Sequence, residues 1–137
     1  KLLINFSKKK NSPIKIALII TNNKKAKGIY YARKNRIKSL FVNYKNKYKA
    51  ESKILINLEN SKINFICLAG FMKILSPKFI KKFNGIIINI HPSLLPKYKG
   101  LNTHKKVLKN KEKYSGATVH LVTQKLDSTV LLCMALK

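Results

Sequence analysis

The sequence predicts an α/β fold in which a mostly parallel sheet is flanked by helices. Short apolar runs with the character of buried β-strands alternate along the chain with stretches whose apolar residues recur at helical spacing. Turn-forming Pro, Gly, Asn and Ser residues separate many of these segments. Strands that alternate with helices usually pair in parallel, through right-handed crossover connections. The order of the segments therefore predicts the fold class.

The first half of the chain has this alternation most clearly. Residues 1–11 begin with an apolar stretch and continue into a run of lysines, which is typical of a helix with a basic carboxyl end. Ser12 and Pro13 end this helix, and the apolar run after them is predicted to be a buried strand. The predicted strands of this half are 14–20, 39–42 and 64–69, and its other predicted helices are 24–35 and 49–61.

The second half begins with a strong helix start. Ser76 is predicted to be the N-cap and Pro77 the first helical residue, and the helix runs to about Phe83 before Gly85 ends it. A run of isoleucines then predicts a strand over 85–91 that is buried on both faces. The remaining predicted elements are a helix over 103–110, a strand over 115–123 with one covered face, and a last strand over 130–136.

The chain of 137 residues is strongly basic. Lys and Arg number 30 against 4 Asp and Glu, which gives a formal net charge of +26 at pH 7. Such a charge attracts anions, which include nucleic acid, acidic membranes and phosphorylated or polycarboxylate metabolites. The basic residues are spread along the chain rather than gathered in one tail or stripe, so compositional drift is the alternative explanation.

The length and the two chain ends predict one truncated domain. A chain of this length builds one hydrophobic core. Its first residue is Lys1 rather than methionine, and it ends within the apolar stretch 130–136. We therefore expect a single domain over 1–137 that is cut at both ends.

The cysteines and the apolar runs favour a cytoplasmic protein. Cys67 and Cys133 both lie within apolar runs, so they are predicted to be buried core thiols rather than a disulfide framework. Neither has a second Cys or a His at metal-ligand spacing, so no zinc site is expected. No apolar run is as long as a membrane span, and no signal peptide opens the chain.

Two polar residues at the end of the isoleucine strand are the strongest candidates for a catalytic site. Asn89 and His91 are two residues apart, so in a strand their side chains point to the same side. Ligands of open α/β sheets bind outside the carboxyl ends of the strands. A carboxamide and an imidazole at such an end could hold a developing oxyanion and move a proton. Alternatively, Asn89 caps a turn and His91 is a structural histidine.

A single carboxylate is the third candidate. Asp127 is the only aspartate of the chain and follows the strand predicted over 115–123. A carboxylate close to His91 would favour the charged imidazole and could accept the proton of an attacking amine. Alternatively, Asp127 forms an Asx turn in its loop. His120 is predicted to be a structural histidine beside the site, and His104 is predicted to be exposed.

Three stretches of the chain match a known family in their residues, order and spacing. The first is Leu-Ala-Gly-Phe-Met-Lys-Ile-Leu-Ser-Pro at 68–77, and the second is Asn-Ile-His-Pro-Ser-Leu-Leu-Pro-Lys-Tyr-Lys-Gly at 89–100. The third is Gly-Ala-Thr-Val-His at 116–120, followed by Leu126 and Asp127. Together they resemble the phosphoribosylglycinamide formyltransferases of purine synthesis. The resemblance implies a Rossmann-like formyltransferase fold, whose first strand and C-terminal segment would lie outside this chain.

The resemblance also implies direct transfer of a formyl group without a metal. The donor would be 10-formyltetrahydrofolate and the acceptor the primary amine of glycinamide ribonucleotide, in de novo purine biosynthesis. His91 would be the general acid and oxyanion partner, and Asn89 would donate to the formyl oxygen. Asp127 would keep His91 protonated and help to remove the amine proton through water. The residues implied to bind the folate are Met72, Lys73, Ile74, Leu75, Asn89, Thr123, Gln124, Lys125, Leu126 and Asp127.

Two other functions compete with this one. Methionyl-tRNA formyltransferases share the Asn-x-His-x-Ser-Leu-Leu-Pro motif, and the net charge would suit tRNA. The stretch Leu-Asn-Thr-His at 101–104 resembles the nucleotide enzyme instead, because the tRNA enzyme typically has small residues and proline there. A non-catalytic, basic nucleic-acid-binding domain would leave Asn89, His91 and Asp127 unexplained. We therefore expect small-molecule substrates, with neither a nucleic acid nor a membrane as partner.

Overall fold

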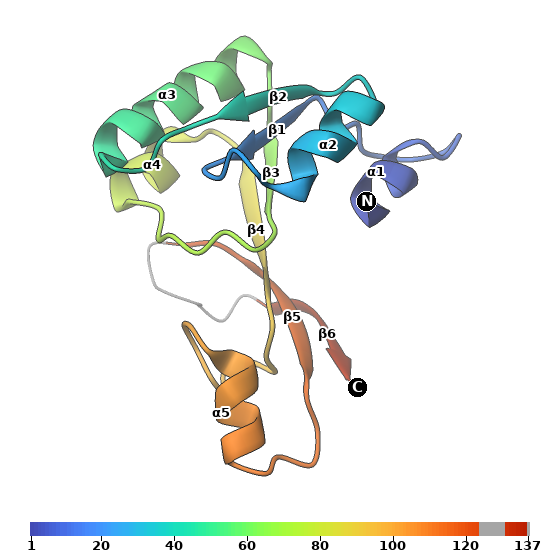
Figure 1. Ribbon diagram of the computed structural model, residues 1–137, viewed down its shortest axis with the longest axis vertical. Helices are drawn as coiled ribbons and strands as arrows, with labels where there is room; N and C mark the ends of the chain where they lie inside the picture. Colours follow the sequence, from blue (N-terminus) through green and yellow to red (C-terminus); the bar gives the residue numbers. More distant parts are fainter. Residues whose placement is uncertain (124–130, 137) are drawn as a thin grey trace. The chain divides into compact units, whose positions relative to one another are not determined.

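The computed structural model describes residues 1–123 and 131–136. These residues belong to two compact units, Lys1–Ile63 and Asn64–Lys137 (Figure 1). Both units combine helices with β-strands, so the predicted α/β class is confirmed.

The first unit is built around a pair of parallel strands. Their pairing begins with Leu18 opposite Lys38 and ends with Thr21 opposite Phe41. Helix α2 packs against both strands, and its Ala32 is fully buried. The elements of this unit are α1 (Leu2–Ser7), β1 (Leu18–Thr21), α2 (Lys27–Lys34), β2 (Lys38–Phe41) and α3 (Lys47–Asn60).

Helix α3 buries one face, as its apolar spacing predicts. Ala50, Ile54 and Leu58 follow one another at intervals of one helical turn, and all three are buried. The Asn46 side chain caps the helix by accepting a hydrogen bond from the Lys49 amide at 3.0 Å.

Strand β1 begins later than predicted. The predicted strand started at Ile14, whereas the observed one starts at Leu18. The Ser12 hydroxyl accepts a hydrogen bond from the Ile14 amide at 3.3 Å and donates one to the Ile14 carbonyl at 3.1 Å. These local bonds occupy the backbone N–H and C=O groups of Ile14, which a strand beginning at this residue would use for pairing.

The second unit contains a four-stranded sheet in the order β3-β4-β5-β6. Its parallel pairing is β3 with β4, and β5 pairs antiparallel with both β4 and β6 (Figure 1). The predicted parallel pairing is therefore observed for β1 with β2 and for β3 with β4, whereas the pairs formed by β5 are antiparallel. The elements of this unit are β3 (Phe65–Leu68), α4 (Pro77–Lys82), β4 (Ile86–His91), α5 (Thr103–Lys109), β5 (Gly116–Leu121) and β6 (Leu131–Leu136).

The start of α4 is the one that the sequence predicts. The Ser76 hydroxyl accepts a hydrogen bond from the Phe79 amide at 3.0 Å, and Pro77 is the first helical residue. Phe79 and Phe83 are buried and stack with ring centroids 6.5 Å apart. The cap fixes where the helix begins, and the two aromatic rings fix which face is buried.

Two burial predictions are wrong. The isoleucine strand is not buried on both faces, because Ile86 is 52% exposed and Ile90 is 41% exposed. Cys133 is exposed rather than buried, whereas Cys67 is half-buried and its burial raises the pKa of the thiol. Cys133 lies on β6 at the edge of the sheet, where an apolar run does not guarantee cover on either face.

Replacing Gly85 with Ala is expected to destabilise the protein by about 1–3 kcal/mol, the usual range for overpacking. A Cβ at Gly85 would overlap the carbonyl oxygen of Asn64, which accepts the Ile86 amide at 3.0 Å where β3 and β4 begin to pair. The measurement is the free energy of unfolding in denaturant.

Gly28→Ala is the matched control for this prediction. A Cβ at Gly28 would meet its nearest atom, in Ile19, at 4.0 Å, so there is room for it in α2. We expect Gly28→Ala to be neutral or to stabilise by roughly 0.4–1 kcal/mol. Equal effects of the two substitutions would contradict the steric explanation.

Candidate active site

Asn89 and His91 lie on one face of β4, as predicted. In the pairing with β5, Asn89 is opposite His120 and His91 is opposite Thr118. Residues directly opposite each other in a sheet share a face, and both of these β5 residues are buried. Along β5, Thr118 and His120 are buried and their neighbours are half-buried, so one face of this strand is better covered than the other, in the direction that its alternation predicts. His91 itself is only 5% exposed.

His120 orients the Asn89 amide. Its Nδ1 lies 3.0 Å from the carbonyl oxygen of Leu121, which can only accept a hydrogen bond, so Nδ1 carries the hydrogen. In the neutral ring Nε2 is then an acceptor, and Asn89 Nδ2 donates to it at 3.3 Å. An amide nitrogen has two hydrogens, and this contact uses one of them. The other remains for donation in the same site.

His91 is held by the loop that follows β4. Its Nε2 lies 3.0 Å from the carbonyl oxygen of Tyr98 and therefore donates a hydrogen to it. The ring meets His120 edge-on, with centroids 6.4 Å apart and an interplanar angle of 77°. The imidazole is thus fixed by both the loop and the neighbouring strand.

A buried hydroxyl pair shapes the beginning of this loop. The Thr118 hydroxyl donates to the Ser93 carbonyl at 2.7 Å and accepts from the Leu95 amide at 3.0 Å. The Ser93 hydroxyl in turn donates to the Lys97 carbonyl at 2.8 Å. Thr118 is fully buried and Ser93 is 1% exposed, so these bonds satisfy backbone groups that water cannot reach. They hold the Ser-Leu-Leu-Pro part of the motif against β5.

The segment expected to bind folate follows β3. Because β3 and β4 are parallel and Leu68 lies opposite Asn89, this segment leaves the sheet at the edge where β4 ends. Met72 is 68% exposed and Ile74 is 64% exposed, which offers apolar surface to a flat ligand, whereas Leu75 is buried. Lys73 is also exposed. A Cβ placed on Gly70 would meet no atom within 4 Å, so the start of this segment is open.

The remaining predicted site residues come after β5. Thr123 is described and half-buried, and the neighbouring Val122 amide donates to the Ile87 carbonyl of β4 at 2.8 Å. Gln124, Lys125, Leu126 and Asp127 lie outside the described residues, so the convergence of Asp127 with Asn89 and His91 stays a prediction.

The described residues, 1–123 and 131–136, contain neither a cluster of metal-binding side chains nor a membrane-spanning helix. Within these residues no group of three or more His, Cys, Asp and Glu side chains is placed to hold a metal ion. The same part of the chain has no helix with the length and apolar character needed to cross a bilayer. His104 is exposed, as predicted.

Known proteins are similar to this chain over most of its length. The family model described as Formyl transferase matches residues 1–135. The chain is 40% identical over 126 residues to a phosphoribosylglycinamide formyltransferase of Haemophilus influenzae, which covers 90% of the chain and 59% of that protein. It is also 40% identical over 129 residues to the human trifunctional purine biosynthetic protein adenosine-3, covering 92% of the chain and 13% of that protein.

The solved structures show the same likeness. A phosphoribosylglycinamide formyltransferase from Anaplasma phagocytophilum superimposes with a TM-score of 0.91 at 35% identity, covering 98% of the chain and 64% of that structure. One from Brucella melitensis superimposes with a TM-score of 0.89 at 36% identity. The chain thus spans less than two thirds of the first relatives that it matches. Its match to the family model over nearly its whole length shows that the chain belongs to the formyl transferase family.

Proposed function

We propose that this protein is a phosphoribosylglycinamide formyltransferase. It transfers the formyl group of 10-formyltetrahydrofolate to the amine of glycinamide ribonucleotide in de novo purine biosynthesis. The observation that carries this proposal is the pair of Asn89 and His91 on one face at the carboxyl end of β4. The choice of acceptor is supported by the names of the relatives from Haemophilus influenzae and Anaplasma phagocytophilum.

Formyl transfer requires hydrogen-bond donors for the developing oxyanion and a path for the amine proton. When the amine attacks the formyl carbon, a new C–N bond forms and negative charge develops on the formyl oxygen. Asn89 donates its second amide hydrogen to this oxygen, and protonated His91 stabilises the charge beside it. His91 then gives a proton to the folate nitrogen as the old C–N bond breaks. Asp127 takes up the amine proton through water and restores the charged imidazole.

The donor is proposed to lie at the edge where β3 and β4 end. The exposed apolar side chains of Met72 and Ile74 would contact its ring system, and the backbone of the segment would supply polar contacts. The stretch from Thr123 to Asp127 is proposed to close over the same ring. No metal is needed for this chemistry, because the donors and the proton relay come from side chains.

The acceptor is the part of the proposal that most needs a test. Purified protein containing residues 1–137 is incubated with 10-formyltetrahydrofolate and either glycinamide ribonucleotide or methionyl-tRNA at matched concentrations. Release of tetrahydrofolate and formylation of the acceptor are measured together. We expect transfer to glycinamide ribonucleotide, unchanged by a metal chelator. Transfer to methionyl-tRNA alone would favour the tRNA enzyme instead, and transfer to neither acceptor would contradict the proposal.

A binding assay separates the non-catalytic alternative. A basic nucleic-acid-binding domain would bind RNA or DNA with an affinity that falls steeply with salt concentration. We propose that the substrates are small molecules, that the protein acts in the cytoplasm, and that neither nucleic acid nor a membrane is its partner. Tight, salt-sensitive binding of nucleic acid together with absent formyl transfer would support the alternative.

A further inference from the structure

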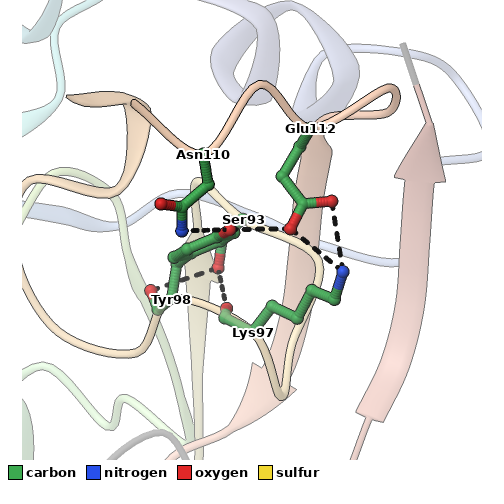
Figure 2. Close-up of polar contacts among 5 residues, drawn as sticks. All are labelled: Ser93, Lys97, Tyr98, Asn110 and Glu112. Carbon is green, nitrogen blue, oxygen red and sulfur yellow. Dashed lines mark hydrogen bonds and ion pairs between the residues drawn. The ribbon is translucent and has the colours of Figure 1, made fainter. Parts of the chain in front are cut away.

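The loop after β4 is tied at its far end by a cluster of polar side chains. The Tyr98 hydroxyl donates a hydrogen bond to Glu112 Oε1 at 2.7 Å and accepts one from Asn110 Nδ2 at 2.8 Å (Figure 2). Lys97 Nζ approaches both carboxylate oxygens of Glu112, at 3.0 and 3.1 Å. The chain has 4 acidic residues and 30 basic ones. Glu112 is one of the acidic residues, and its carboxylate contacts both Tyr98 and Lys97.

These contacts make a charge-assisted network. The pKa of Glu112 is lowered most by the hydrogen bond from Tyr98 and next by the hydrogen bond from Lys97, so the carboxylate is charged at neutral pH. Hydrogen bonds to an ionised acceptor are shorter and stronger than those between neutral groups. Asn110 and Glu112 come directly after α5, so the network joins the loop to the end of that helix.

The backbone of Tyr98 needs such a restraint. Its φ is +56°, in the left-handed region that residues other than glycine adopt at a cost. In this conformation the Tyr98 carbonyl oxygen lies 3.0 Å from His91 Nε2 and 3.4 Å from the Ser93 hydroxyl. One residue therefore has its side chain bound to the α5 end and its carbonyl bound to the buried histidine.

We propose that Tyr98 is a positioning residue for His91, because its hydroxyl, anchored on Glu112 and Asn110, fixes the carbonyl group that receives the His91 Nε2 hydrogen. The network thereby determines the ring orientation of the histidine without touching a substrate. The link to formyl transfer rests on the proposed function, whereas the effect on His91 does not.

The test is the exchange of the His91 Nε2 hydrogen with water, followed by NMR. A hydrogen held by the Tyr98 carbonyl exchanges slowly. Tyr98→Phe removes the anchoring hydroxyl, and we expect this exchange to become about tenfold faster, as for the loss of one ordinary hydrogen bond. Glu112→Gln keeps an acceptor but loses the charge, so a smaller acceleration in the same direction is expected.

Two references make the result specific. Tyr114→Phe removes the hydroxyl of a tyrosine that is 59% exposed and should leave the His91 signal unchanged. The Nδ1 hydrogen of His120, held by the Leu121 carbonyl, is an internal reference in every variant. Equal acceleration at His91 and His120 would mean general loosening and would overturn the proposal. An unchanged His91 signal in both Tyr98→Phe and Glu112→Gln would overturn it as well.

Kinetics distinguish a failure of this proposal from a failure of the proposed function. If the wild-type protein transfers formyl groups, Tyr98→Phe should lower kcat about tenfold and leave KM for the folate nearly unchanged. A raised KM with an unchanged kcat would indicate a binding role and contradict positioning. If the wild-type protein transfers none, the NMR result still decides the role of Tyr98.

Discussion

Replacing His91 with Gln is expected to lower kcat for formyl transfer by about 10²–10⁴-fold, the range for loss of a general acid–base group. Glutamine can still donate a hydrogen bond to the Tyr98 carbonyl, so the loop should keep its shape. It cannot carry a proton to the folate nitrogen or offer a positive charge to the developing oxyanion. Steady-state kinetics give kcat, and calorimetry gives the folate affinity, which should change much less.

His104→Gln is the matched control. His104 is an exposed histidine of α5, so the same chemical change there should leave kcat unchanged. A near-wild-type kcat for His91→Gln would remove His91 from the mechanism. The proposed relay would then have no group to move its proton.

Asn89→Asp is expected to lower kcat by about 10²–10³-fold, the usual effect of losing one oxyanion donor. The substitution keeps the size of the side chain but removes both amide hydrogens. It also places a carboxylate where negative charge develops in the reaction. His120 Nε2, which accepts from the Asn89 amide at 3.3 Å, would then face an anion instead of a donor.

The control for this substitution is Asn22→Asp in an exposed turn of the first unit, which makes the same change of charge away from the site. Circular dichroism and the free energy of unfolding establish that both variants are folded. If Asn89→Asp weakened folate binding and left kcat intact, Asn89 would be a binding group and the oxyanion role would be wrong.

Local chemistry made the element order predictable. Ser76 and Pro77 define the start of α4 through contacts within one helical turn. Contacts this short in sequence can be predicted from the residue types alone. The apolar spacing in α3 predicts its buried face for the same reason. Asn89 and His91 fall on one face because side chains alternate along a strand. The roles proposed for Asn89 and His91 come from the resemblance of their motif to the family, and these roles stay predictions, as does that of Asp127.

Long-range contacts decided the rest. Asn89 and His120 are 31 residues apart, and they meet because β5 runs antiparallel to β4, a direction that alternation along the chain does not specify. Ile86 and Cys133 are exposed because burial depends on what covers each face of a sheet. An apolar run in the sequence does not show whether its faces are covered.

The sequence by itself thus determined the element types, the order of the strands along the chain and the two candidate residues on β4. Only the tertiary structure decided which groups hold those residues, since hydrogen bonds to His91 and Asn89 come from a loop carbonyl and a neighbouring strand that folding brings within reach.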